Sequence, residues 1–99
     1  MQRPSERLKR KIEKENLWLF ILSLLLKRRS YAYEVRDAIK ERFGFWIGTV
    51  TAYKVLYLLE QGGYVTSTTE GRKTYYQITQ QGKDEVRIAR SFLRTMLKH

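Results

Sequence analysis

Two adjacent positive charges, Arg72 and Lys73, follow Gly71 where the sequence predicts a tight turn. Lysine and arginine bind phosphate oxygens whatever the base sequence, so such a turn is suited to a polyanion. The chain carries 20 lysines and arginines against 10 aspartates and glutamates, a formal charge of +10. A charged turn alone is commonly just a solvated loop. With this net charge it favours nucleic acid or an anionic membrane surface as the partner.

A second set of polar side chains opens the stretch "TVTAYKVLYLLEQ", which its apolar spacing predicts to be a helix over residues 49–61. Threonine can bond a phosphate or a base edge, its methyl group can meet a thymine methyl, and lysine can reach guanine or phosphate. The expected inward residues are Ala52, Tyr53 and Leu56, and the expected outward residues are Thr49, Thr51, Lys54 and Val55. The alternative is that Thr49 only caps the helix and Lys54 is only solvated.

Residue combinations typical of enzymes and metal sites are missing from the sequence. It has no cysteine, and its single histidine is the C-terminal His99. No pair of carboxylates offers a general base, and the "GG" at residues 62–63 lacks the following lysine and hydroxyl residue of a phosphate-binding loop. We therefore expect no catalytic activity, no metal and no cofactor. The lack of cysteine also makes a reducing cytoplasm the simplest location.

The most apolar run, Leu17 to Leu26, is well below the roughly 20 residues that a membrane span requires. The residues after it, "KRRSYAYEV", do not resemble a signal-peptide cleavage site. We therefore predict a buried helix and no membrane partner. The basic stretch before it also lacks the tryptophan or phenylalanine of an interfacial helix.

The predicted elements follow from periodicity, caps and turn residues. Ser5 is the expected cap of a first helix that reaches Lys27 without a breaker, and Ser30 caps the second. Gly44 is expected to end the second helix in a left-handed conformation. Thr79 caps the last helix. The predicted order is helix, helix, short strand, helix, hairpin, helix, over residues 5–27, 31–43, 45–47, 49–61, 64–79 and 80–99.

This order predicts a mainly α (α+β) fold, a winged helix-turn-helix with an extended N-terminal helix and an added C-terminal helix, to which the family resemblance described below assigns dimerisation. We expect one domain over residues 1–99, made of a basic arm (1–16), the winged helix-turn-helix (17–79) and the dimerisation helix (80–99). The hairpin would be the wing that lies along the DNA backbone. Along its second strand, alternation turns Tyr76 and Ile78 inward and Tyr75 and Gln77 outward.

From about Leu17 to about Lys83 the chain resembles the PadR-like transcriptional regulators. The resemblance rests on "ILSLLL", "YAYEV", "TAYKVLYLLEQGGYV" and "GRKTYYQITQQGK". The family pattern along the third helix and its exit is matched by Tyr53, Leu56, Leu59 and Gly63. The family wing pattern is matched by Arg72, Tyr75 or Tyr76, Ile78, Thr79 and Gly82. The chain departs from the family at Tyr31-Ala32, where His-Gly is common, and at Tyr57 and Leu58, where lysine or arginine is common.

The resemblance implies a homodimer built through the terminal helices, and the apolar stripe of the last helix independently allows one. The alternative is that this stripe packs on the first helix of the same chain. The expected interface residues are Leu8, Ile12, Ile88, Phe92, Leu93 and Met96. Some family members bind drug-like molecules between tryptophans of the last helix. Here that helix has Phe92 instead, and we expect Trp18 and Trp46 in the core, so a small-molecule effector is allowed but not indicated.

The leading hypothesis is a sequence-specific transcriptional regulator, a repressor that binds double-stranded DNA with an inverted-repeat operator. The expected DNA-binding residues are Ser30, Tyr31, Thr49, Thr51, Lys54, Arg72, Lys73 and Tyr75. The alternatives are a non-specific architectural protein that binds DNA or RNA, and a winged-helix module that binds another protein.

Overall fold

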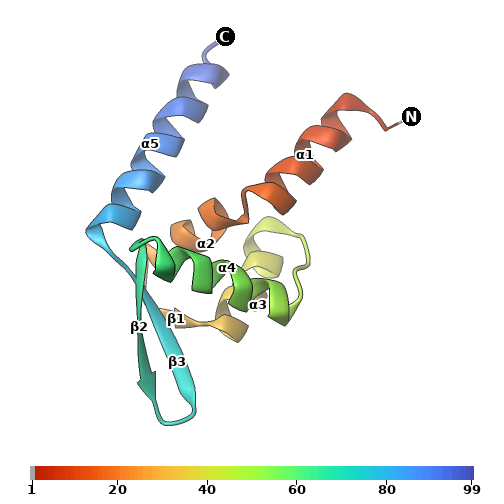
Figure 1. Ribbon diagram of the computed structural model, residues 1–99. Helices are drawn as coiled ribbons and strands as arrows, with labels where there is room; N and C mark the ends of the chain where they lie inside the picture. Colours follow the sequence, from red (N-terminus) through yellow and green to blue (C-terminus); the bar gives the residue numbers. More distant parts are fainter. Residues whose placement is uncertain (1) are drawn as a thin grey trace.

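The computed structural model describes residues 2–99 and folds them into five helices around a small antiparallel sheet (Figure 1). The helices are α1 (Pro4–Glu15), α2 (Leu17–Leu25), α3 (Ala32–Phe43), α4 (Thr49–Gln61) and α5 (Gln80–Leu97). The strands are β1 (Ser30–Tyr31), β2 (Val65–Glu70) and β3 (Lys73–Ile78), in the order β1-β3-β2. Helix α4 has the predicted bounds, and the predicted hairpin is confirmed.

The hairpin of β2 and β3 projects from the body of the molecule as a wing (Figure 1). Its strands pair from Val65 opposite Ile78 to Glu70 opposite Lys73. Gly71 takes the left-handed φ of 64° that this tight turn requires. Tyr76 and Ile78 are buried, as alternation predicted, and Gln77 faces solvent. The wing is therefore anchored by one face of β3, while its tip remains exposed.

The predicted strand at residues 45–47 is wrong. Phe45 packs against the core and Ile47 is buried within the connection between α3 and α4, so their apolar character reflects burial without strand pairing. The third strand is β1, in which Ser30 pairs with Tyr76. Ser30 is therefore a buried strand residue, and the expected cap position of α3 belongs to Tyr31.

The predicted continuous first helix is also wrong, because Asn16 separates α1 from α2. The carbonyl of Asn16 accepts the N–H of Leu19 at 3.1 Å and so begins α2. Helix α1 starts after Arg3 with Pro4 in its first turn, so Ser5 is not its cap. The break separates a helix with no buried residue from one that lies in the core.

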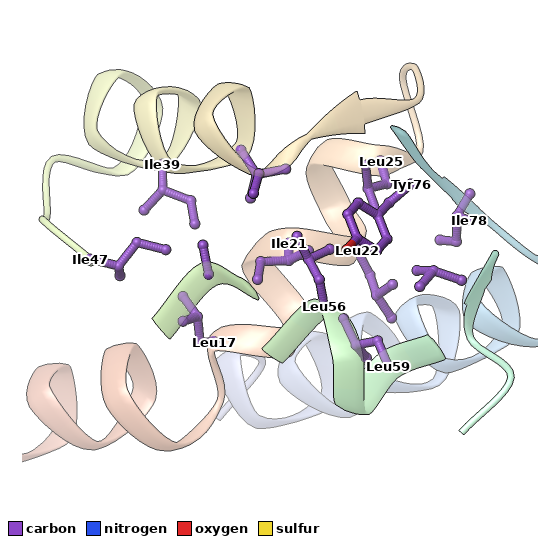
Figure 2. Packing of buried hydrophobic residues seen from close by; sticks show 14 of the residues in the cluster. Leu17, Ile21, Leu22, Leu25, Ile39, Ile47, Leu56, Leu59, Tyr76 and Ile78 are labelled. Carbon is purple, nitrogen blue, oxygen red and sulfur yellow. The ribbon is translucent and has the colours of Figure 1, made fainter. Parts of the chain in front are cut away.

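Helix α2 forms the centre of the core, with Ile21 and Leu22 fully buried (Figure 2). It packs against α3, α4, α5 and β3, as expected of a helix that is apolar nearly all round. Ile39 of α3 and Leu56 of α4 belong to the same core cluster, and Val86 is the buried hydrophobic residue that α5 contributes. Within residues 2–99, no helix combines the length and the apolar character needed to cross a membrane.

The start of α5 is fixed by a joint at the base of the wing. The Thr79 hydroxyl accepts the Gly82 N–H at 3.1 Å and donates to the Gly63 carbonyl at 2.7 Å, so the predicted cap is confirmed. The Thr79 N–H also donates to the Tyr64 carbonyl at 3.0 Å. Both ends of the hairpin and the first turn of α5 are therefore held together. Beyond this joint, α5 runs away from the body on the side opposite the wing (Figure 1).

Gly82 is the tightest point of this joint, which leads to the first prediction. A Cβ there would collide with the Tyr64 carbonyl oxygen and lie 2.7 Å from Cγ1 of Ile78. Alanine favours a helix more than glycine does. The Tyr64 carbonyl is a backbone group, however, and moving it out of the way of the new Cβ would disturb the joint. Gly82→Ala should therefore lower the free energy of unfolding by about 3 kcal/mol, measured by urea denaturation.

Gly48→Ala is the matched control, because a Cβ at Gly48 would have no neighbour within 4 Å. Its φ of −76° also suits alanine, so its cost should stay below about 1 kcal/mol. Equal losses in the two variants would show that the contact at Gly82 does not set the stability of the joint.

Candidate nucleic-acid interface

The outward face of α4 differs in part from the one expected. Ala52 and Leu56 are buried as predicted. Tyr53 is 44% exposed, so its predicted inward position is wrong, and Val55 packs against the core although an outward position was expected. The inward stripe shifts toward Val55 because Leu59 continues it. The tyrosine ring then lies outside, where its hydroxyl reaches water.

Thr49 is held to α3 by an arginine that is not among the predicted DNA-binding residues. Arg36 Nη1 donates to Thr49 Oγ1 at 2.8 Å, which joins α3 to the first residue of α4. The guanidinium lies 4.9 Å from the ring centre of Tyr33 and forms an ion pair with Asp37 at 3.0 Å. Thr49 can still donate its own hydroxyl hydrogen, but its position is now set by Arg36.

Trp46 is not in the core, contrary to the prediction. It is 64% exposed, because its neighbours Phe45 and Ile47 take the inward positions of the connection. Lys40 Nζ lies 5.0 Å from its ring centre and the Arg36 guanidinium lies 5.8 Å away. A wet tryptophan and two cations therefore lie together just before α4. Trp18 is partly buried against the core, in line with its prediction.

Near the turn of the wing, three of the predicted residues come together. The Tyr31 and Tyr75 rings meet edge to face at 5.6 Å between centres, from paired positions of β1 and β3. Lys73 Nζ lies 4.5 Å from the Tyr31 ring centre. A cation over an aromatic face is attracted to it, so this ammonium group has a preferred position beside the turn that carries Arg72.

Arg29, which precedes β1, contacts the wing and is not among the predicted residues. Its guanidinium lies 4.4 Å from the Tyr75 ring centre and pairs with both carboxylate oxygens of Glu70, the Nη2–Oε1 distance being 3.1 Å. The hydrogen bond from Arg29 lowers the pKa of Glu70, and the same bond raises the pKa of Arg29. The pair therefore stays ionised near neutral pH, and Glu70 offsets one positive charge of the wing.

The remaining predicted contacts lie in different environments. Thr51, Lys54 and Arg72 are exposed and free to meet a partner. Ser30 is only 7% exposed, so its side chain is the least accessible of the eight predicted residues. The wing lies on one side of the molecule, and α1 and α5 project from the other (Figure 1).

The apolar stripe of α5 lies on that other side and is largely uncovered. Ile88, Phe92 and Met96 are between 55% and 63% exposed, and Leu93 is 37% exposed. On α1, Leu8 is exposed and Ile12 is half-buried. Helix α5 packs on α2 of the same chain near its start, but most of the stripe is exposed, and α1 and α5 project from the body as separate helices (Figure 1). Helix α1 of the same chain therefore does not cover the stripe.

The sequence model of a protein family, the transcriptional regulator PadR-like family, matches residues 21–88, which is more than half of the chain. The chain belongs to this family. The predicted resemblance is therefore confirmed, and it places the protein among transcriptional regulators, which are not enzymes.

Solved structures agree with the family assignment. A transcriptional regulator from Clostridium thermocellum is 30% identical, with a TM-score of 0.75 over 82% of this chain and 85% of that one. A PadR family transcription regulator from Clostridium difficile is 26% identical, with a TM-score of 0.76 over 82% and 90%. A winged-helix DNA-binding protein from STIV, 19% identical, shares the fold with a TM-score of 0.75 over 83% and 91%. A comparison with curated proteins found no significant match. The predicted mainly α winged helix-turn-helix is confirmed.

The contact between Arg36 and Thr49 leads to a prediction about stability. Arg36→Ala removes the only side-chain hydrogen bond that the structure, over residues 2–99, gives Thr49, and it frees the first turn of α4. A hydrogen bond from a partly buried charged donor is worth about 1 kcal/mol, so unfolding in urea should become easier by about that amount.

Arg42→Ala is the matched control, since Arg42 is an exposed arginine in the last turn of α3, the helix that carries Arg36. Its effect should be within about 0.5 kcal/mol of zero. If both variants unfold like the unchanged protein, Arg36 does not stabilise α4.

Proposed function

We propose that this protein is a sequence-specific DNA-binding repressor that acts as a homodimer on an inverted-repeat operator. The observation that carries the proposal is the pairing of an exposed helix start at Thr49–Lys54 with a cationic wing, in a chain of net charge +10. In helix-turn-helix proteins the second helix of the motif enters the major groove and its first residues meet base edges. Here α3 and α4 are that pair, and α4 is the reader helix.

The reader helix would contact DNA through Thr49, Thr51 and Lys54. Arg36 fixes Thr49 before any DNA is bound, so the start of α4 loses little freedom on binding. Lys54 lies one turn further along and reaches guanine or phosphate. The cations Arg36 and Lys40, beside Trp46, would face the DNA backbone next to the groove.

The wing would bind the phosphate backbone through Arg72 and Lys73. The Tyr31 ring holds the Lys73 ammonium, and Tyr75 supports Tyr31 from β3. Ser30 fixes the strand that carries Tyr31, so it would act mainly by placing its neighbours. Contacts of this kind set register and affinity without reading the sequence.

The homodimer would form through α5 and α1, on the side opposite the wing. An exposed stripe of large apolar residues on a protruding helix is costly in water and is covered by a second copy. The expected interface combines Ile88, Phe92, Leu93 and Met96 with Leu8 and Ile12. Two-fold symmetry would then place two reader helices about 34 Å apart on successive major grooves, which calls for an inverted repeat.

The test of this function is selection from a random-sequence DNA pool, followed by affinity measurements across salt concentrations. Enrichment of an inverted repeat is the expected result. A steep salt dependence without enrichment would instead identify a non-specific architectural protein, because phosphate contacts alone produce that behaviour. No binding to DNA at moderate salt would contradict the proposal and point to RNA or a protein partner.

The wing and the reader helix should respond differently to single changes. Arg72→Ala should weaken binding to all sequences alike and reduce the salt slope by about one unit per wing, since one phosphate contact is lost. Lys54→Ala should weaken binding to the operator by about tenfold. Both are measured by fluorescence anisotropy, with Arg42→Ala as the cationic control. If Arg72→Ala left both affinity and salt slope untouched, the wing assignment would be wrong.

The interface assignment is tested by Leu93→Asp, which places a charge inside the proposed apolar contact. The dimer should dissociate into monomers at micromolar concentration, because a buried unpaired carboxylate is strongly unfavourable. Sedimentation velocity gives the readout. Ser91→Asp adds the same charge on the opposite side of α5 and should leave the dimer intact. A Leu93→Asp protein that still sediments as a dimer would exclude the α5 interface.

A further inference from the structure

The outward face of α4 carries several exposed apolar and aromatic side chains, although the chain as a whole is strongly basic. Val50 is 81% exposed, Tyr57 58% and Tyr53 44%, and they share one face of the helix. Lys54 is the one cation of α4. Phosphate attraction therefore accounts for little of this face, and its apolar groups call for an apolar feature of the partner.

Val50 has the most prominent place on this face. It is the second residue of α4, within the turn that meets base edges first. The residue before Thr49 is Gly48, which has no side chain and no neighbour within 4 Å of where a Cβ would be. Because Arg36 holds the Thr49 hydroxyl against α3, Val50 is the first side chain of α4 that points freely outward. A DNA base edge could therefore approach it without obstruction.

The chemistry of the major groove offers valine one partner. Base edges there carry hydrogen-bond donors and acceptors, and the only alkyl group is the C5-methyl of thymine. Valine has neither donor nor acceptor. Against a cytosine amino group or a guanine oxygen it would displace water without replacing the hydrogen bond, which is unfavourable. Against a thymine methyl both apolar surfaces leave water together, which is favourable.

We propose that Val50 is a specificity-determining residue that contacts the C5-methyl group of a thymine in each half-site. This inference rests on the proposed function, since it requires α4 to lie in the major groove. It adds what the helix reads: a thymine methyl, recognised by an aliphatic side chain near the start of α4.

Thr51 is the competing source of a methyl contact on the same turn. It lies about 100° around the helix from Val50. It lines a depression of about 570 Å³ with Glu13 and Lys14 of α1 and Trp46. Thr51 therefore lies at the edge of the outward face next to α1, whereas Val50 shares the centre of that face with Tyr53 and Lys54. The position of Val50 is therefore the better one for a base edge.

The experiment replaces thymines of the selected operator, one at a time, by deoxyuridine, which removes only the C5-methyl group. At one position in each half-site the unchanged protein should bind the uracil operator about fourfold more weakly, the equivalent of one buried methyl-sized group. Val50→Ala should bind the thymine operator about fifteenfold more weakly, because both copies of the homodimer lose the contact, and it should no longer distinguish thymine from uracil there. Anisotropy of a labelled operator gives both dissociation constants.

Thr51→Ser is the matched control, because it removes a methyl group from the neighbouring residue and keeps the hydroxyl. It should retain the full preference for thymine over uracil. If the preference disappears in Thr51→Ser and survives in Val50→Ala, or if no thymine of the operator is sensitive to the change, the inference is overturned. In either case the operator is still bound, so the proposed function stands apart from this result. Since Val50 lies in solvent, circular dichroism of Val50→Ala should show an unchanged fold.

Discussion

The burial of α2 is the constraint on which the rest of this structure depends. A chain of 99 residues buries a modest core, and here α3, α4, α5 and β3 all pack against one short apolar helix. The inner face of each surrounding element packs against Ile21, Leu22 and their neighbours (Figure 2). The outer faces of α4, the wing and α5 contribute little to this core, so their exposed side chains are available to bind partners.

Side chains on these outer faces are nevertheless not left loose. Arg36 is held by Thr49 and by the ring of Tyr33, Lys73 lies over Tyr31, and Arg29 is fixed between Tyr75 and Glu70. Cation–aromatic contacts and short hydrogen bonds keep long cationic chains near one position without removing their charge. Such an arrangement reduces the conformational entropy lost when a phosphate or base is bound.

The sequence predicted the elements whose signals are local and missed those set by distant partners. Gly48 and Gly62 flank α4, and Gly71 marks the wing, so both elements could be predicted. The break at Asn16 could not, because the helical pattern continues through it. Nor could β1, whose two residues are a strand only because Tyr75 and Tyr76 lie beside them. In the site, Arg36 and Arg29 find partners 13 and 41 residues away, so the sequence assigned them no role. Trp46 was misplaced because alternation permits either Trp46 or its two neighbours to face inward.

The joint at Thr79 links the two sides of the molecule mechanically. Its hydroxyl bonds tie α5 to Gly63 at the exit of α4, and its N–H ties it to Tyr64 at the start of the wing. In the proposed dimer, α5 sets the angle between the two copies. Because α5 starts at the joint with no flexible linker, the angle between the two copies would also fix the orientation of α4 and of the wing in each copy. The spacing between half-sites would then be a property of α5 packing, whereas the bases read within each half-site depend on the outer face of α4. Under the proposed function, these two determinants of specificity would be carried by different elements and could change independently.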